Sequence, residues 1–150
     1  MLREKFSEKL KDAIRAKDRL RMSTLRLIQA AVKDRDIASR GSGKDPVSDE
    51  EILQILAKMI KQREESARIY EEAIRLELAQ QERDEITIIK EFLPAQLPEE
   101  KMREACASVV VDTGAHGLRD MGKCMNALKE RYPGQMDFAK ASGVVKGMLQ

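Results

Sequence analysis

The segment GLRDMGKC, residues 117–124, has the spacing of a phosphate-binding loop, in which glycine, four residues, glycine and lysine follow one another. In such a loop the backbone amides hold phosphates, the lysine reaches the outer phosphates, and a serine or threonine hydroxyl binds magnesium. Cys124 stands at the hydroxyl position and removes that magnesium ligand. The nearest candidate strand ends at Val111, six residues before Gly117, instead of running directly into it.

The same segment also has the spacing of an amphipathic helix, because its apolar residues recur at helical intervals: Leu118, Met121, Met125 and Leu128. We therefore predict a helix here and no nucleotide site. Gly122 then lies inside a helix, where glycine is less stable than alanine by about 0.5–1 kcal/mol. Two explanations stay open. Gly122 allows close contact with a neighbouring helix, or it lets a nucleic-acid or partner backbone approach beside Arg119 and Lys123.

The remaining residues of nucleophile or acid–base type do not form a recognisable constellation. His116 is the single histidine and lies between Gly114 and Gly117, which predicts a turn position with a structural or solvated role. Cys106 falls on the inward face of a predicted helix and is assigned to the core. Cys124 has no base that the sequence reveals. We expect no autonomous active site.

Acidic residues are plentiful, but their spacing is that of solvated helix faces. Glu64 with Arg68 and Glu71 with Arg75 are expected to pair at i,i+4. No cluster of histidine and cysteine has the spacing of a metal site. We predict neither a metal nor a cofactor.

Basic residues concentrate in the first forty positions, which carry 12 Lys or Arg against 6 acidic residues. They include Arg15, Lys17, Arg19, Arg21, Arg26, Lys33, Arg35 and Arg40. Residues 41–97 are acidic, with 8 basic against 13 acidic residues. The basic helices are read as a solvated face or, if the charges share one surface, as an electrostatic footprint for nucleic acid. With few aromatic side chains for stacking, that footprint favours a folded RNA.

The composition places these residues on helices. Charged residues make up 36% of the chain, apolar residues 42% and aromatic residues 3%, a mixture typical of solvated helices packed by aliphatic side chains. No apolar run reaches the length of a membrane span, and the first residues lack the apolar block of a signal peptide. Two cysteines without disulfide spacing indicate a reducing environment. We predict a cytoplasmic protein that does not bind membranes.

Helical periodicity and its interruptions define the N-terminal part, residues 1–93. The first helix has its inward face at Leu2, Phe6, Leu10 and Ala13 or Ile14. Asp18 is a candidate cap for the second helix. The inward face of this helix is predicted at Leu20, Thr24, Leu27 and Ala31, flanked by Leu25, Ile28 and Val32. RGSGKDPV, residues 40–47, predicts a loop, and Ser48 with Glu51 forms a capping box for the third helix. No glycine follows before residue 93, so this segment is one long helix or two helices with a turn within EEAIRLELAQ.

FLPAQLPEEK, residues 92–101, is the predicted boundary, because Pro94 disfavours helix before it and Pro98 suits the start of a helix. Residues 94–150 are expected to form three short helices, the last capped by Asp137. The predicted fold is all-α, with an N-terminal hairpin or bundle of about four helices and a small C-terminal three-helix bundle.

Three segments carry a resemblance to a known family: LRMSTLRLIQAAVKDRDIA, DEITIIKEFLPAQLPEE and DTGAHGLRDMGKCMNALKERYPGQMDFAKAS. Over essentially the whole chain the sequence resembles the YqeY-like (GatB/YqeY) family. The family motif falls on Asp120, Met121, Gly122 and Lys123, on Gly114 and Gly117 in the preceding turn, and on Phe92, Leu93, Pro94 and Leu97 in the linker. Isoleucine stands at position 74, where the family commonly has glycine, and Asn126 replaces a small residue.

The C-terminal part, from about Leu97, is similar to the tail domain of the B subunit of tRNA-dependent amidotransferases, which use glutamine as the nitrogen donor. In those enzymes the tail is a tRNA-contacting appendage. The resemblance implies a non-catalytic tRNA-binding accessory module, with the amidotransferase or other translation proteins as possible partners. The expected nucleic-acid-binding residues are Arg119, Gly122, Lys123 and Lys129. The alternative is a protein-interaction adapter that uses the acidic central helices.

Overall fold

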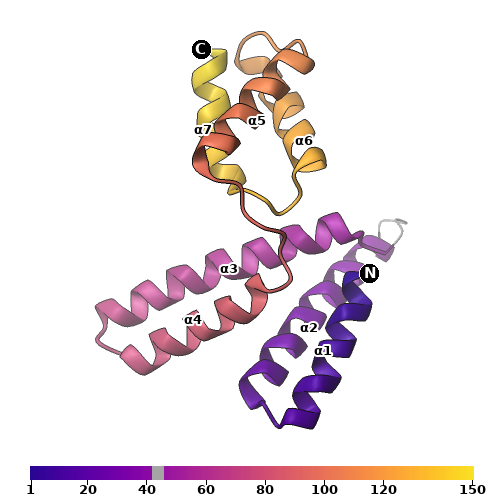
Figure 1. Cartoon of the computed structure of the whole chain (residues 1–150), viewed down its shortest axis with the longest axis vertical. Helices are drawn as coiled ribbons and strands as arrows, with labels where there is room; N and C mark the ends of the chain where they lie inside the picture. Colours follow the sequence, from indigo (N-terminus) through magenta and orange to yellow (C-terminus); the bar gives the residue numbers. More distant parts are fainter. Residues whose placement is uncertain (42–45) are drawn as a thin grey trace. The chain divides into compact units, whose positions relative to one another are not determined.

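The computed structural model describes residues 1–41 and 46–150, and these residues form helices and no strands (Figure 1). In chain order the elements are α1 (Leu2–Ala16), α2 (Arg19–Gly41), α3 (Asp49–Glu72), α4 (Leu76–Lys90), α5 (Glu99–Asp112), the 3-10 helix η1 (Leu118–Asp120), α6 (Met121–Arg131) and α7 (Phe138–Leu149). The predicted all-α class is confirmed. The chain divides into two compact units, Met1–Leu93 and Pro94–Gln150, called unit 1 and unit 2 below.

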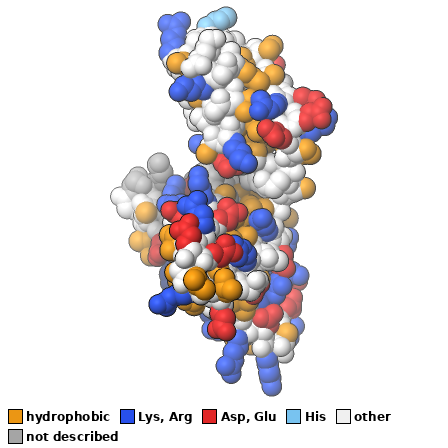
Figure 2. All heavy atoms as spheres, turned by 90° about the vertical axis from the view of Figure 1, so that its left-hand side faces the viewer, with side chains coloured by type: hydrophobic (Ala, Val, Ile, Leu, Met, Phe, Trp, Pro, Cys, Tyr) orange, Lys and Arg blue, Asp and Glu red, His pale blue; other side chains and the backbone are white. Residues whose placement is uncertain are grey.

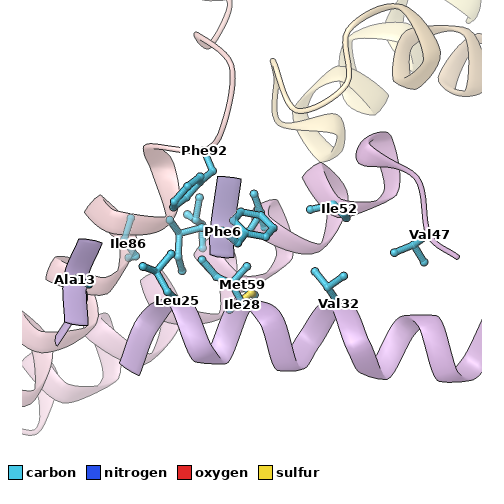
Figure 3. Close-up of a cluster of buried hydrophobic side chains, with 13 residues drawn as sticks. Phe6, Ala13, Leu25, Ile28, Val32, Val47, Ile52, Met59, Ile86 and Phe92 are labelled. Atoms are coloured by element: carbon cyan, nitrogen blue, oxygen red, sulfur yellow. The ribbon is translucent and has the colours of Figure 1, made fainter. Parts of the chain in front are cut away.

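The core of unit 1 is aliphatic and is closed by one aromatic pair. Figure 3 shows Leu25, Ile28 and Val32 pointing from α2 into the cluster that contains Phe6 of α1. The rings of Phe6 and Phe92 meet edge to face with centroids 5.0 Å apart, a favourable geometry for aromatic side chains. Of the predicted inward residues of α2, Leu20 and Ala31 are half-buried and Leu27 is 46% exposed, whereas the others are buried: Thr24, Leu25, Ile28 and Val32. Leu27 was therefore assigned to the wrong face, because Ile28 already fills that turn's place in the core.

Both ends of the α1–α2 connection follow capping rules. Lys17 adopts a left-handed conformation with φ of 55°, and the amide of Asp18 donates to the carbonyl of Ala13 over 3.0 Å. This arrangement ends α1 in the manner of a Schellman motif. The Asp18 carboxylate accepts from the amide of Arg21 over 3.1 Å, which confirms it as the cap of α2.

The beginning of α3 lies beside the start of the chain. Ser48 accepts from the amide of Glu51, so the predicted N-cap of α3 is confirmed. Arg3 forms a bidentate pair with Asp36 at 2.7 Å and also donates to the carbonyl of Val47. The predicted loop at residues 40–47 falls mostly on residues 42–45, outside the described residues. Arg40 and Gly41 belong to the last turn of α2 instead.

α3 and α4 are two helices that form an antiparallel hairpin. Its turn contains no glycine and lies within EEAIRLELAQ, the segment for which the sequence allowed one long helix or two helices. Ile74 occupies the left-handed position with φ of 59°, and Arg75 donates its amide to Tyr70. Each helix has a small buried residue near the turn, Ala67 in α3 and Ala79 in α4. The turn that connects α3 to α4 therefore lies at Ile74, although this chain lacks the glycine that the family commonly has at that position.

Unit 2 is a small bundle of α5, α6 and α7 around its own core. The buried set includes Cys106, Val109, Cys124, Leu128 and Val145. The linker is fixed to this bundle, since the amide of Leu97 donates to Gln135 over 2.8 Å. Pro98 is the residue directly before α5, one position earlier than a first-turn proline. The predicted cap of α7 is confirmed, because Asp137 accepts from the amide of Ala139.

Candidate nucleic-acid interface

The turn between α5 and η1 positions the start of the candidate site, and its backbone requires glycine. The amide of Gly114 donates to Val111 and that of Ala115 donates to Val110, which is the Schellman pattern. Gly114 takes φ of 62°, a conformation that residues with a Cβ rarely adopt. Ala115 is buried beneath the turn, so the chain leaves α5 in a fixed direction.

Asp120 holds the second half of this turn. Its carboxylate accepts from the backbone amide of His116 over 2.7 Å. This hydrogen bond lowers the pKa of Asp120, and the nearby positive charges of Lys123 and Arg119 lower it further. The ionised carboxylate thus lies between the turn and the two cations expected to contact nucleic acid.

The four predicted binding residues are all exposed, but they do not form one cluster. Arg119 lies in η1, and Gly122 and Lys123 lie in the first turn of α6. Lys129 follows Lys123 by six residues, which corresponds to about 9 Å along a helix and about 120° around it. Lys129 instead shares the line of Gly122, seven residues before it. The structure therefore brings together Arg119, Gly122 and Lys123, with Lys129 at the far end of α6.

Gly122 has open space where a side chain would project. A Cβ built on it meets no atom within 4 Å. The explanation by close packing against a neighbouring helix is therefore wrong. Asn126, four residues later, is exposed and does not fill this space.

The segment that resembles a phosphate loop is helical from Leu118 onward. Its first three residues form η1 and the rest belong to α6, so the helix prediction is confirmed with a tighter first turn. The valines before it lie in α5 and not in a strand. The amide of His116 is already bonded to Asp120, so it is not available to bind a phosphate.

Both cysteines lie in the core of unit 2. Cys106 is fully buried, as predicted, and its thiol lies 3.9 Å from the sulfur of Met102. Burial raises the pKa of Cys106, so the unreactive thiol is favoured over the thiolate. Cys124 is fully buried as well and lies 3.7 Å from the hydroxyl of Thr113. His116 is exposed in the turn between Gly114 and Gly117, as predicted.

The basic residues of the N-terminal helices serve different purposes. Arg21 forms a two-pronged pair with Glu91, at 2.5 and 3.0 Å, that ties α2 to the end of α4. Arg15 approaches Asp12 of its own helix at 4.0 Å. The other members of the predicted set are exposed: Lys17, Arg19, Arg26, Lys33, Arg35 and Arg40. One predicted footprint residue is thus structural.

Sequence reasoning missed the ion pairs that join helices. Arg63 of α3 binds the buried Glu85 of α4 at 2.9 Å, and Arg3 binds Asp36. Glu71 pairs with Arg83 across the hairpin and not with Arg75 as predicted. The reason is that Arg75 lies beyond the end of α3, so it is no longer one helical turn from Glu71. Spacing along one helix gives no signal for pairs formed between helices.

Two further properties bear on function. Within residues 1–41 and 46–150, no three histidine, cysteine or acidic side chains gather as a metal site. No helix in these ranges is both long and apolar enough to cross a membrane.

Comparison with known proteins gives matches along most of the chain. The family model described as Yqey-like protein matches residues 3–149. The chain is 36% identical over 106 residues to altered inheritance of mitochondria protein 41, mitochondrial, of Kluyveromyces lactis, covering 70% of this chain and 55% of that protein. The protein of the same name from Lachancea thermotolerans is 34% identical over 100 residues, covering 67% and 51%. That of Saccharomyces cerevisiae is 33% identical over 89 residues, covering 59% and 46%. The chain spans about half the length of these relatives.

The relatives correct the predicted location. They are named as mitochondrial proteins, so the prediction of a cytoplasmic protein is wrong by this comparison. The prediction rested partly on two unpaired cysteines, which indicate a reducing environment. Such an environment does not identify one compartment.

Proposed function

The chain belongs to the YqeY-like family, and we propose that it is a tRNA-binding accessory module that has no catalytic function by itself. The observation that carries the proposal is the pair of exposed cations, Arg119 and Lys123, beside the open backbone of Gly122. The relation to the amidotransferase tail is part of the proposal and rests on the resemblance of unit 2.

The charge pattern of unit 2 supports an anionic ligand. Its carboxylates are mostly engaged, since Glu99, Glu104 and Asp112 form ion pairs and Asp120 and Asp137 accept backbone hydrogen bonds. In contrast, five of its basic side chains form no ion pair within unit 2, which the structure describes throughout: Arg119, Lys123, Lys129, Lys140 and Lys146. Four carboxylates of the unit also stay outside these ion pairs, namely Glu100, Asp120, Glu130 and Asp137, so unit 2 has a net charge of +1.

The geometry of α6 suits a folded RNA better than a single strand. Lys123 and Lys129 project from different sides of the helix, so phosphates from two strands, or from both sides of a groove, can reach them together. Gly122 lets a sugar–phosphate backbone come close to the helix axis beside Lys123. Such contacts give affinity and orientation without reading base sequence.

The test is fluorescence anisotropy of labelled bulk tRNA titrated with the chain across a salt series, with duplex DNA for comparison. We expect selective tRNA binding that weakens as salt rises. The double variant Arg119→Glu/Lys123→Glu should weaken binding by about tenfold or more and reduce the salt slope by about one to two. Lys146→Glu is the matched control, because it reverses an exposed charge of unit 2 outside η1 and α6.

Two results would remove the proposal. The first is no tRNA binding at low salt. The second is an equal loss of affinity in Lys146→Glu and in the double variant, which would indicate unspecific attraction. Circular dichroism of each variant would establish that the helices are intact.

A second candidate function, the protein-interaction adapter, is favoured by the end of the α3–α4 hairpin. Four large aliphatic side chains are exposed within ten residues there: Ile69, Ile74, Leu76 and Leu78. This turn faces the viewer in Figure 2, where hydrophobic side chains lie at the surface among charged ones. Such a cluster is unusual on a solvated surface. A partner retained after nuclease treatment and lost in Leu76→Asp would support the adapter; retention by this variant would contradict it.

A further inference from the structure

A groove of about 720 Å³ lies on unit 2, between the first turn of α5 and one face of α7. Apolar side chains from four parts of the unit line it: Leu97 of the linker, Met102 of α5, Met136 before α7, and Val144 and Met148 of α7. Gly143 and Gly147 form part of its α7 wall, one helical turn apart. This groove lies outside the proposed RNA-binding residues of α6.

The two glycines have no role inside the unit. A Cβ built on Gly143 or on Gly147 meets no atom within 4 Å, and both have ordinary helical dihedrals without positive φ. Alanine at either position would favour the helix more. The glycines therefore weaken α7 without improving any contact in the folded unit. Their effect is to expose helix backbone along the groove, which permits another helix to approach closely.

The methionines give the groove an adaptable apolar lining. Unbranched methionine side chains change conformation readily and are frequent on surfaces that accept helices of different sequence. Met148 is 41% exposed, whereas Met102 and Met136 are buried. An apolar surface of this kind is suited to aliphatic side chains and unsuited to phosphates.

The charges around the groove specify the occupant further. Glu99 and Arg103 neutralise each other at 3.3 Å, and Asp137 accepts from the amide of Ala139 as the cap of α7. Two charged lining residues, Asp137 and Lys140, take part in no ion pair within unit 2, which the structure describes throughout. The Asp137 carboxylate is held in the cap of α7, and Lys140 is the lining cation that no carboxylate neutralises. Lys140, Gly143 and Gly147 follow one another at i, i+3 and i+7, so they share one face of α7.

We propose that this groove binds an α-helix of a partner protein, with aliphatic side chains between α5 and α7 and a carboxylate opposite Lys140. The glycine backbone sets the close approach of the two helices, and the lysine selects an acidic sequence. This inference goes beyond tRNA binding and uses a different surface.

A defined peptide pair tests the proposal. One fluorescein-labelled amphipathic helix of about four turns carries leucine on one face and glutamate on the other, and its counterpart carries lysine instead of glutamate. We expect the glutamate peptide to bind the full chain in preference to the lysine peptide. Gly143→Leu/Gly147→Leu should weaken this binding at least tenfold, because its side chains enter the open groove. Lys140→Glu should reverse the preference between the peptides.

The control is Ala139→Leu, which adds a leucine at an exposed position of α7 that does not line the groove, one turn before Gly143. It should bind the glutamate peptide like the unchanged chain. Circular dichroism is expected to show undiminished helix content in the double leucine variant, since leucine favours a helix more than glycine does and neither new Cβ meets an atom within 4 Å.

Three outcomes would overturn the proposal. The glutamate peptide binds the unchanged chain and the double leucine variant equally, neither peptide binds, or Lys140→Glu keeps the original preference. Light scattering supplies a further criterion. If the unchanged chain self-associates and the double leucine variant is monomeric, the occupant is a second copy and not a partner helix.

Discussion

Replacing Ile74 by glycine should stabilise unit 1. Ile74 connects α3 to α4 with φ of 59°, and its side chain is 82% exposed. A left-handed conformation is unfavourable for a residue with a Cβ by about 1–2 kcal/mol, and a β-branched side chain belongs at the upper end of that range. The hydrogen bonds of the turn involve backbone atoms only, so glycine retains them.

Two smaller effects reduce the stabilisation that Ile74→Gly gains from the relief of backbone strain. Glycine increases the conformational entropy of the unfolded chain, which opposes folding by about 0.5–1 kcal/mol. Losing the small buried fraction of the isoleucine side chain removes about 0.3–0.5 kcal/mol of hydrophobic stabilisation. Taking the upper part of the strain range, the net stabilisation is about 0.5 kcal/mol. For a unit of this size the melting temperature should rise by roughly 2–4 °C.

Thermal unfolding followed by circular dichroism, together with urea unfolding, measures this change. Ile74→Ala is the control, because alanine removes the branched side chain but keeps the Cβ that disfavours positive φ. It should be less stable than Ile74→Gly. Equal or lower stability of the glycine variant would refute the reasoning, since it would mean that Ile74 gains more from contacts than it loses in backbone strain.

Three other residues give further predictions. The pKa of Asp36 is lowered to about 2, mainly by hydrogen bonds from Arg3 and the amide of Val47. Its contribution to stability is therefore present above about pH 4 and is lost as the pH falls toward 2, and Asp36→Asn should flatten this acid limb in pH-dependent unfolding. Arg63→Met leaves Glu85 without its partner and should destabilise by about 3 kcal/mol, whereas Arg63→Met/Glu85→Met should recover most of the loss in urea unfolding. The buried hydroxyl of Thr24 has no hydrogen-bond partner among residues 1–41 and 46–150, so Thr24→Val should stabilise by about 1 kcal/mol in the same assay.

Features that depend on neighbours in sequence were predictable. Asp18, Ser48 and Asp137 each precede a helix and cap it through hydrogen bonds two or three residues away, as their residue types indicate. Helical periodicity likewise identified most core positions. Its error at Leu27 arose because Leu27 and Ile28 are both apolar, and the pattern alone does not tell which one faces the core.

Features that depend on how helices meet were not predictable. Arg63 and Glu85 are 22 residues apart, and nothing in their spacing distinguishes them from solvated charges. The turn at Ile74 lacked its usual glycine, so the sequence left its position open. For the candidate site, the sequence identified Arg119, Gly122 and Lys123 on one short segment, but whether Gly122 faces a neighbour or solvent is decided by the packing of α6.

Gly122 and Gly143 offer a comparison that separates the two proposed surfaces. Both lie in helices, and a Cβ on either meets no atom within 4 Å. Gly143→Ala should therefore stabilise unit 2 by about 0.5–1 kcal/mol, and Gly122→Ala by less because it lies in the first turn of α6.

Binding should respond differently at the two glycines. Gly122→Ala is expected to weaken tRNA binding in anisotropy titrations and to leave binding of the glutamate peptide unchanged. Gly143→Ala is expected to do the reverse. If both variants gain stability and lose neither ligand, the exposed backbone serves no contact at these positions, and the physical argument for both surfaces fails. If Gly122→Ala loses only tRNA binding and Gly143→Ala loses only peptide binding, each glycine lowers helix stability at a separate surface. Each then allows a different partner to approach the helix backbone.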